Sequence, residues 1–306
     1  MRFSIITPSR NNSDWLKLCV ASVADQKVEL EHLVQDGAST DGTLDWILND
    51  PRVDAVSAPD RSMYEAINCG FARATGDILA YLNCDEQYLP GALGKVREYF
   101  ERRPDVSIVF GNAVVVEADG SFICYRKTVT PQKLHTWVHG NLSIFTCATF
   151  FRRSLLEKGL IFNPNVRMVG DTEWLLRVIA SDAKMALLRE YTSAFTMTGR
   201  NIGFTESARR EHVQFYGSAP SWARAIRRPI ILHHWTRRFV SGAYRQAPFN
   251  YSIYTQKNPS CRTDFQVAKP TFRWRGSNYV PDADVVPGAK PFNTIRPENV
   301  VSSVED

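Results

Sequence analysis

The chain has 306 residues, of which 44% are hydrophobic and 23% charged, and these fractions exclude a collagen-like, coiled-coil or wholly disordered protein. The length suits one large domain or two small ones, at about 100–200 residues per domain. No apolar stretch approaches the roughly 20 residues needed to cross a bilayer, and Met1 leads into a strand-like run that is unlike a signal peptide. We therefore expect a cytoplasmic protein.

Charge is unevenly distributed along the chain. Residues 1–110 carry 11 Lys and Arg against 17 Asp and Glu, and the other 196 residues carry 26 against 15. The two parts therefore have different electrostatic roles. Six scattered cysteines form no C-x-x-C pair, which argues against a zinc site and a thioredoxin-type motif. We expect most of them to be small buried hydrophobes.

Strands and helices are expected to alternate over the first 110 residues. In chain order we expect a strand at Phe3–Thr7, a helix at Asp14–Ala24, a strand at Leu30–Asp36, a helix at Leu44–Asn49, a strand at Val53–Ser57, a helix at Tyr64–Ala74, a strand at Ile78–Leu82, a helix from Pro90 to Arg102 and a strand at Val106–Phe110. This alternation predicts right-handed βαβ units and a mostly parallel sheet.

The pattern becomes mixed after Gly111. We expect a hairpin of Ala113–Glu117 and Phe122–Arg126, a strand at Ala148–Arg152, a helix at Trp174–Ala180 and a strand at Lys184–Leu188. Residues 222–245 are basic and aromatic, and from about Pro248 the composition predicts irregular or mobile structure.

Polar loops follow four of the expected strands. In parallel sheets ligands bind beyond the carboxyl ends of the strands, so the loops after Thr7, Asp36, Ser57 and Leu82 should line one crevice. The turn after the first strand has no glycine, and neither G-x-x-x-x-G-K-[ST] nor G-x-S-x-G occurs. The sequence therefore lacks the dinucleotide fingerprint, the P-loop and the hydrolase nucleophile elbow.

Four phrases occur in order along the chain: IITPSRN at 5–11, QDGASTDGT at 35–43, DRSMYEAIN at 60–68 and ATGDILAYLNCDE at 74–86. Together they closely resemble family 2 glycosyltransferases, the inverting nucleotide-sugar enzymes of the GT-A fold, over roughly residues 3–215. The resemblance implies an α/β, Rossmann-like fold with a mostly parallel central sheet flanked by helices. It also implies a domain at 1–215, with a nucleotide-sugar half (1–110) and an acceptor half (111–215), followed by a basic helical and irregular extension at 216–306.

Asp36 stands just beyond a strand, followed by small residues that let a ligand approach the backbone. Its carboxylate can accept a base N–H or a ribose hydroxyl, and the resemblance implies that it binds the donor's uracil or equivalent base, with Thr7 and Pro8 as the pocket floor. The alternative is a simple turn with a helix cap at Ser39 or Thr40. Three further residues are candidates for the donor nucleotide: Arg10, Asp60, which could equally be a turn residue, and Asn83, which can bond ribose.

Asp85 follows an apolar strand, where its oxygens could hold Mn²⁺ or Mg²⁺ together with the donor diphosphate. Such a metal would neutralise the charge of the departing nucleoside diphosphate. The match to the family's D-x-D motif is imperfect, because Asn83 replaces the first Asp and Glu86 extends the acidic pair. The second protein ligand stays open, and the alternative is a surface acidic turn.

Asp171 stands at the start of an expected helix, where an Asp is also a good cap. The segments TFFRR at 149–153 and GDTEWLLR at 170–177 resemble the acceptor half of the same family, which implies that Asp171 is the general base. Glu173 is the reserve candidate. Inversion in one displacement needs one base and stabilisation of the leaving group, not two catalytic carboxylates. No Q-x-x-R-W motif or membrane helix points to a polymer synthase.

Two basic regions remain. Arg200 and His212 lie where the family often has a flexible loop over the donor diphosphate, although a solvated basic helix is an equal alternative. Residues 222–245 mix aromatic residues with six arginines, which suits anionic lipid headgroups. No nucleic-acid fold signature is present, so we expect no nucleic-acid partner.

We therefore expect a metal-dependent hexosyltransferase-type enzyme that moves one sugar from a nucleotide-sugar, with UDP as the expected nucleotide, to a saccharide or lipid-linked acceptor in cell-surface glycan biosynthesis. It would act peripherally at the inner face of a membrane. One alternative is a non-catalytic nucleotide-sugar or glycan-binding module. The presence of both Asp85 and Asp171 argues against it. Another is a sugar-phosphate nucleotidyltransferase, which would need a Gly- and Arg/Lys-rich loop in place of residues 8–12.

Overall fold

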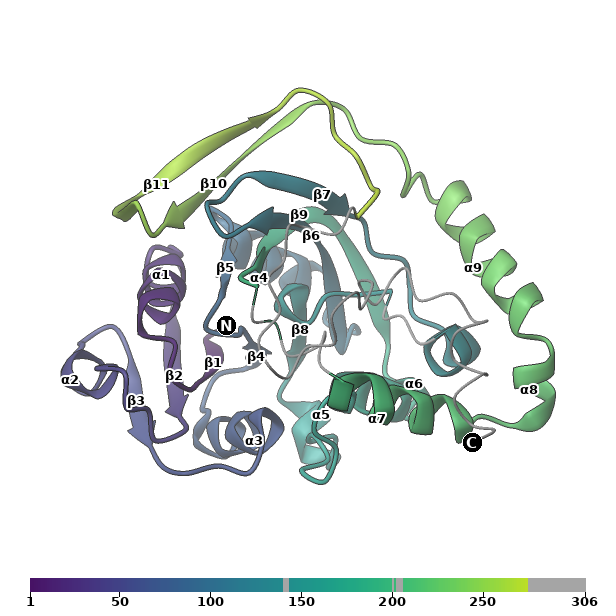
Figure 1. The fold of residues 1–306 in the computed structure, drawn as a ribbon, viewed down its shortest axis with the longest axis horizontal. Helices are drawn as coiled ribbons and strands as arrows, with labels where there is room; N and C mark the ends of the chain where they lie inside the picture. The colour runs from purple at the N-terminus through teal and green to yellow at the C-terminus, as the bar shows by residue number, and fades with distance from the viewer. Residues whose placement is uncertain (140–142, 200, 202–205, 275–306) are drawn as a thin grey trace.

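A curled β-sheet with helices on its faces forms the centre of the molecule (Figure 1). The structure is a computed structural model that describes residues 1–139, 143–199, 201 and 206–274. Its strands are β1 (Phe3–Ser9), β2 (Leu30–Asp36), β3 (Asp54–Ser57), β4 (Ile78–Tyr81), β5 (Glu86–Tyr88), β6 (Ile108–Glu117), β7 (Phe122–Arg126), β8 (Thr149–Arg152), β9 (Met185–Met197), β10 (Phe249–Thr255) and β11 (Asn258–Val267).

The helices connect and cover these strands. They are α1 (Ser13–Ala24), α2 (Leu44–Ile47), α3 (Met63–Arg73), α4 (Ala92–Arg102), α5 (Ser154–Glu157), α6 (Gly170–Ala180), α7 (Glu206–Gly217), α8 (Ser221–Ala225) and α9 (Arg227–Val240), with a π-helical turn η1 (His135–His139) and a 3₁₀ turn η2 (Thr146–Ala148).

The central sheet has the order β3-β2-β1-β4-β8-β6-β9-β5, with β7 beside β6. Strands β1 to β4 run parallel, and β6 and β9 point the same way because β8 is antiparallel to both β4 and β6. Only β5, β7 and β8 in the described sheet run in the opposite direction. The prediction of a mixed, mostly parallel sheet is confirmed.

Alternation along β1 divides the core between the two faces of the sheet. Phe3 and Ile5 pack with residues of α1 and α4, whereas Ile6 packs with residues of α3 and α6. Side chains of a strand point alternately to opposite faces, so a continuous apolar run marks a strand covered on both sides. Four of the six cysteines, Cys19, Cys84, Cys124 and Cys147, are buried as expected.

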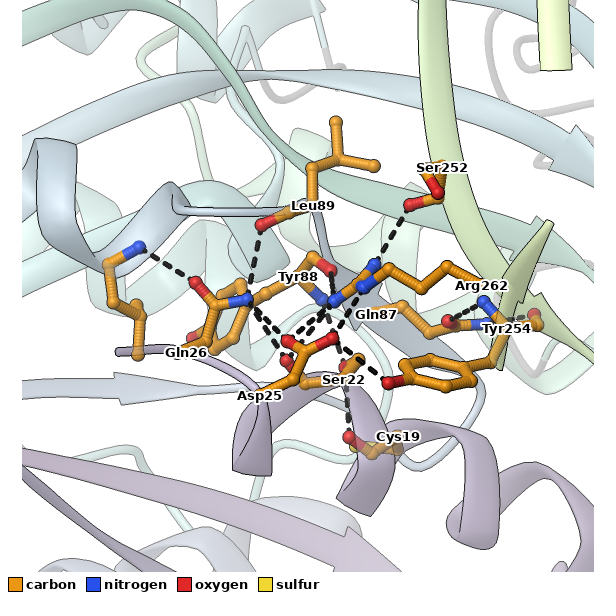
Figure 2. Close-up of polar contacts among 11 residues, drawn as sticks. Cys19, Ser22, Asp25, Gln26, Gln87, Tyr88, Leu89, Ser252, Tyr254 and Arg262 are labelled. Carbon is orange, nitrogen blue, oxygen red and sulfur yellow. Dashed lines mark hydrogen bonds and ion pairs between the residues drawn. The ribbon is translucent and has the colours of Figure 1, made fainter. Parts of the chain in front are cut away.

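Residues 249–267 form a β-hairpin, so the expectation of irregular structure there is wrong. Strands β10 and β11 pair antiparallel, and their apolar side packs on Leu89, Val114, Val116 and Ala194. The polar side of the hairpin contacts α1 and β5 (Figure 2). These contacts join residues more than 160 positions apart, so they leave no local sequence signal.

Helical structure in residues 221–240 agrees with the predicted basic helical extension. Helices α8 and α9 lie along the outer edge of the molecule, on the side away from α1 and β2 (Figure 1). Within the described ranges, none of the helices combines the length and hydrophobicity that a membrane span requires.

Candidate active site

The loops after β1 and β2 are joined at the carboxyl edge of the sheet. Asn11 Oδ1 accepts the N–H of Thr40 at 2.7 Å, and Ser39 Oγ accepts the N–H of Asn11 at 2.8 Å. Asn11 and Ala38 both have positive φ values, 50° and 57°, which non-glycine residues seldom adopt. Strained backbone of this kind is held only where the surrounding contacts demand it.

Gly37 is the point at which three loops meet. A Cβ atom there would overlap a carboxylate oxygen of Asp60 and press on the side chain of Arg10. Burial raises the pKa of Asp60, and the positive charge of Arg10 opposes this rise. Arg10, Asp36 and Asp60 therefore share one region, as the sequence predicted for the loops of one crevice.

The carboxylate of Asp36 is fully buried and already accepts three hydrogen bonds. Its donors are the N–H and hydroxyl of Ser39 and the hydroxyl of Ser57, with the Ser57 bond at 2.8 Å. A carboxylate has about four acceptor positions, so capacity for one ligand donor remains. Helix α2 has Thr43 at its N-cap position, so neither Ser39 nor Thr40 caps it.

Thr7 and Pro8 lie in β1 and are buried. The Thr7 hydroxyl is 2.9 Å from Nε2 of His32, a buried histidine of β2. Burial lowers the pKa of His32 to about 3, so this imidazole is neutral at pH 7. Because the hydroxyl faces the interior, any contact of Thr7 with a nucleotide would involve its main chain.

Residues 83–86 form a tight turn between β4 and β5. Asn83 N–H donates to Glu86 Oε2 at 2.8 Å, and Glu86 N–H donates to the Asn83 carbonyl at 3.0 Å. Glu86 is 1% exposed, so its side chain braces the turn from inside. Asp85, between them, is less deeply buried and is contacted by the amide of Asn201 at 3.4 Å.

The turn offers the kind of oxygen atoms that a hard divalent cation takes. Within the described residues, the buried atoms Asn83 Oδ1 and Glu86 Oε1 have no hydrogen-bond partner. Burial raises the pKa of both Asp85 and Glu86, and the charge of Asp85 raises that of Glu86 further. Oxygen donors with unused capacity fit Mn²⁺ or Mg²⁺. In the described part of the chain no three acidic, His or Cys side chains are placed so that they could hold a metal ion together, so the diphosphate would have to supply further ligands.

Asp171 lies in the first turn of α6, one residue after the helix begins. Its Oδ1 accepts the N–H of Thr172 at 2.7 Å, and its own N–H donates to the hydroxyl of Tyr64 at 3.2 Å. Val169 occupies the N-cap position, so Asp171 is not the cap itself. Burial raises the pKa of Asp171 to about 6, a value suited to a base that works near neutral pH.

Tyr64 and Glu211 support this position, and the sequence analysis assigned no role to either. The ring of Tyr64 lies against Gly170, where a Cβ would overlap it. The carboxylate of Glu211, on α7, accepts the N–H groups of Arg167 and Met168 at 2.8 and 2.6 Å and so holds the segment before α6. The only sequence feature that pointed to Tyr64 was its place in the phrase at 60–68. No sequence feature pointed to Glu211 except its place in a charged segment.

Glu173 makes a two-pronged ion pair with Arg177, with nitrogen–oxygen distances of 2.7 and 2.8 Å. A carboxylate held in this way is less available as a base than Asp171.

Tyr81 is influenced by both acidic regions, the turn at residues 83–86 and Asp171. Burial raises the pKa of its hydroxyl well above the usual value, and the charges of Asp171 and Glu86 add to the effect. The charges of the base candidate and of the acidic turn thus both act on one tyrosine.

The two basic candidates differ in what the structure shows. Arg200 lies outside the described residues. His212 is half-buried on α7, next to Glu211. Asn201, which the sequence analysis left without a role, extends from the end of β9 to Asp85 and also bonds the carbonyl of Thr196 at 3.0 Å.

The C-terminal hairpin holds β5, the strand that begins at Glu86. The side-chain amide of Gln87 bonds the Tyr254 main chain in both directions, each at 2.9 Å (Figure 2). Arg262 makes a two-pronged ion pair with Asp25 and donates to the carbonyl of Tyr88 at 3.0 Å (Figure 2). The acidic turn is therefore anchored by residues that are distant in sequence.

Known proteins are similar to this chain in sequence and in fold. The model of the family described as glycosyl transferase family 2 matches residues 4–160. An uncharacterized glycosyltransferase of Nostoc sp. is 24% identical over 214 residues, which are 66% of this chain and 66% of that relative. A glycosyltransferase of Mycobacterium bovis named for PGL/p-HBAD biosynthesis is 28% identical over 193 residues, 59% of this chain and 71% of its own length. The chain thus spans about two thirds of the length of these relatives.

Solved structures extend the comparison to the fold. S. aureus TarS has a TM-score of 0.56 at 15% identity, over 78% of this chain and 44% of TarS. Its fragment 1–349 in complex with UDP gives 0.54 at 15% identity, over 78% and 72%. The mannosyltransferase PcManGT of Pyrobaculum calidifontis, in complex with GDP-Man and Mn²⁺, gives 0.51 at 17%, over 76% and 75%. The GT-A fold expected from the sequence is confirmed, and the chain belongs to glycosyl transferase family 2.

Proposed function

We propose that this glycosyltransferase moves one sugar from a nucleoside-diphosphate sugar to an acceptor hydroxyl, with inversion at the anomeric carbon. The observation that carries the proposal is the arrangement around Tyr81. An acidic turn with unused oxygen capacity and a separate carboxyl with a raised pKa both lie near enough to this tyrosine for their charges to raise the pKa of its hydroxyl. Inversion in a single displacement needs a leaving-group site and a base on opposite sides of the sugar.

Asp36, Asp60 and Arg10 are the proposed donor-nucleotide residues, with the main chain of Thr7 and Pro8 beneath the base. The remaining acceptor position of Asp36 suits a base N–H or ribose hydroxyl. UDP is the proposed nucleotide, supported by the complex of TarS 1–349 with UDP. PcManGT was solved with GDP-Man, so GDP is the comparison nucleotide in the tests.

Asp85 is the residue that would hold Mn²⁺ or Mg²⁺, with the unused oxygen of Asn83 as a further candidate ligand and with Glu86 bracing the turn. Asn83 also stays the proposed contact of the donor ribose. Such an ion, when bound, neutralises negative charge on the departing diphosphate. The Mn²⁺ complex of PcManGT supports this assignment. His212 and Arg200 are further candidates for the diphosphate side.

Asp171 is the proposed base. Its carboxylate takes the proton of the acceptor hydroxyl while that oxygen attacks the anomeric carbon. The bond from this carbon to the diphosphate oxygen breaks, and the leaving nucleoside diphosphate takes the electron pair. Tyr64 positions Asp171 through the N–H bond at 3.2 Å, and Glu173 stays the reserve base.

We assign the transfer to residues 1–215, with 216–306 as a basic extension. The proposed acceptor is a saccharide or a lipid-linked saccharide, and the proposed location is peripheral, at the inner face of a membrane. The name of the M. bovis relative, with its PGL biosynthesis, supports cell-surface glycan or glycolipid synthesis.

Titration calorimetry with UDP and GDP, with and without Mn²⁺, tests the donor assignment. We expect UDP to bind more tightly when Mn²⁺ is present. A second assay measures release of the nucleoside diphosphate from UDP-sugars. Binding without any Mn²⁺-stimulated release or transfer would support the non-catalytic module instead.

A further inference from the structure

Large hydrophobic side chains are exposed in one region of the extension. Of the ten large hydrophobic residues exposed in the described part of the chain, six fall between residues 222 and 240, with exposed fractions from 44% to 79%. Isolated exposed hydrophobic residues are common, but a contiguous group marks an interaction surface. The six residues are Trp222, Ile226, Leu232, Trp235, Phe239 and Val240.

Helix α9 presents two different faces. Leu232, Trp235 and Phe239 follow one another at intervals of three and four, so they form one stripe on the solvent side. On the opposite side Ile230 and His234 are buried, where α9 packs against η1. The buried face is sufficient to pack α9 against the rest of the protein. The exposed apolar stripe is not needed for that packing, so its hydrophobic side chains call for another explanation.

The charge around this stripe is of one sign. No Asp or Glu occurs between Glu211 and Asp264, a stretch that carries all the residues named above. Arg224, Arg228 and Arg245 are exposed within it. Arg228 precedes Leu232 by four residues, so it continues the same stripe. A surface of this composition complements a negatively charged, partly apolar partner.

Three of the six arginines in residues 222–245 contact the protein instead. Arg227 donates to the Val138 carbonyl at 3.1 Å, and its guanidinium lies 4.9 Å from the ring centre of Tyr216. Arg238 is 8% exposed, with its guanidinium 5.3 Å from the ring centre of Tyr244. Arg237 donates to the Thr130 carbonyl at 3.0 Å and lies 3.4 Å from Nδ1 of His135. All three arginines therefore hold α9 in place, and a test of the outer surface must leave them unchanged.

We propose that the outer surface of α8 and α9 docks on an anionic lipid bilayer. Trp222, Leu232, Trp235 and Phe239 would lie at the boundary of headgroups and acyl chains, and the exposed arginines would contact lipid phosphates. Aromatic and aliphatic residues beside basic ones are the composition of helices that lie in a membrane interface. A second copy of this chain is a poorer partner, because the two positive surfaces would repel each other.

The proposed docking helix α9 is connected to the candidate base through direct contacts between secondary-structure elements. Helix α9 packs on η1, and η1 also contacts α6, the helix that carries Asp171. The inference rests on the membrane location within the proposed function and makes the lipid-linked class the acceptor to test. Vesicle binding needs neither donor nor acceptor, so it can be tested independently of transfer.

Sedimentation with vesicles tests the proposal. The full chain should co-sediment with phosphatidylcholine vesicles that contain ~30% phosphatidylglycerol, weakly with phosphatidylcholine alone, and less as salt rises. The triple variant Leu232→Ser, Trp235→Ser, Phe239→Ser should bind anionic vesicles ~100-fold more weakly, because three apolar side chains no longer leave water. The pair Arg224→Gln, Arg228→Gln should lose about 20-fold.

The double variant Leu48→Ser, Ile161→Ser is the matched control, because it removes two exposed hydrophobic residues elsewhere on the surface. It should bind vesicles as the unmodified chain does. All variants should keep their melting temperature and their affinity for UDP, measured in the same preparations. Failure of UDP binding in every form would count against the donor assignment and leave the docking result intact.

Equal sedimentation of the unmodified chain with and without anionic lipid would overturn the docking proposal. So would a dimer, measured by sedimentation velocity, that the triple variant converts to a monomer while vesicle binding is absent. Binding of the unmodified chain to a random oligonucleotide with higher affinity than to anionic vesicles would assign the surface to nucleic acid instead.

Discussion

Replacement of Asp171 by Asn separates the proposed base from a structural residue. Asn keeps the shape of the side chain and an oxygen that can accept the Thr172 N–H, now at 2.7 Å. It cannot take a proton from the acceptor hydroxyl. General base catalysis of this kind contributes about 10²–10⁴ in rate, so we expect turnover to fall at least ~100-fold with donor binding unchanged.

The same substitution should increase stability, and the structure gives the size of the effect. Burial raises the pKa of Asp171 from 3.8 to about 6, so the folded protein favours the protonated carboxyl. A raised folded-state pKa means that stability is fully present below the unfolded pKa and is lost as pH rises through about 6. At about 1.4 kcal/mol per pH unit, the ionised carboxyl costs up to ~3 kcal/mol above that pH.

Asp171→Asn should therefore melt at a higher temperature than the unmodified chain at pH 8, by roughly 5 °C, with about half that gain at pH 5 and almost none below pH ~4. Melting curves at both pH values, together with a pH–rate profile, measure the effect. In the unmodified chain turnover should rise as pH increases through about 6.

Glu173→Gln is the matched control. It breaks the ion pair with Arg177, so it should lower stability at both pH values and leave most of the turnover. An Asp171→Asn variant that keeps most of its turnover would refute the base assignment. An Asp171→Asn variant without any pH-dependent gain in stability would refute the raised pKa of the Asp171 carboxyl.

Three further variants test the site and its supports. Asp36→Ala should weaken UDP binding by ~1.5–3 kcal/mol, the contribution of a charge-assisted hydrogen bond; unchanged affinity by calorimetry, in a folded protein, would remove Asp36 from the donor site. Asp85→Asn should lower both Mn²⁺-stimulated turnover and Mn²⁺-dependent UDP binding, and full activity of the unmodified chain in excess EDTA would contradict metal use. Arg262→Ala should cost ~1–3 kcal/mol in urea unfolding by removing the contacts to Asp25 and Tyr88, whereas Lys257→Ala in the same hairpin should cost little.

Local periodicity was sufficient to predict the elements of the first 110 residues except the short strand β5 (Glu86–Tyr88), which was not expected. The expected strands Phe3–Thr7, Leu30–Asp36 and Ile78–Leu82 agree with β1, β2 and β4 to within two residues at either end. Helix α1 likewise covers the predicted segment. These elements are short, strongly patterned and covered on the expected sides, so local sequence and tertiary packing favour the same structure.

The long strands β6 and β9 could not be predicted in full. The sequence predicts one strand that ends at Phe110 and another that begins at Ala113, because Gly111 interrupts the apolar run. In the structure β6 continues through Gly111, where a Cβ would overlap the side chain of Thr192 on β9. Glycine here permits a close approach of two strands and does not mark a turn, which only the neighbouring strand reveals.

In the candidate site, too, some contacts could be predicted from the sequence and others could not. The sequence predicted that the loops carrying Arg10, Asp36 and Asp60 meet, because the carboxyl ends of parallel strands share one edge. The structure agrees through the close contact at Gly37. It could not be predicted that the Thr7 hydroxyl faces His32, because that contact joins two strands whose register is set by the whole sheet.

The sequence by itself determined the family, the order of the first strands and helices, and which polar loops gather at one edge, because these depend on local patterns and on the rule that parallel strands end together. The tertiary structure alone decided which charged side chains are buried, which form ion pairs and which stay exposed. It turns Glu86 inward, pairs Glu173 with Arg177, and buries Arg238 while leaving Arg228 exposed. A side chain's environment depends on whatever packs against it from distant parts of the chain, and no local pattern contains that information.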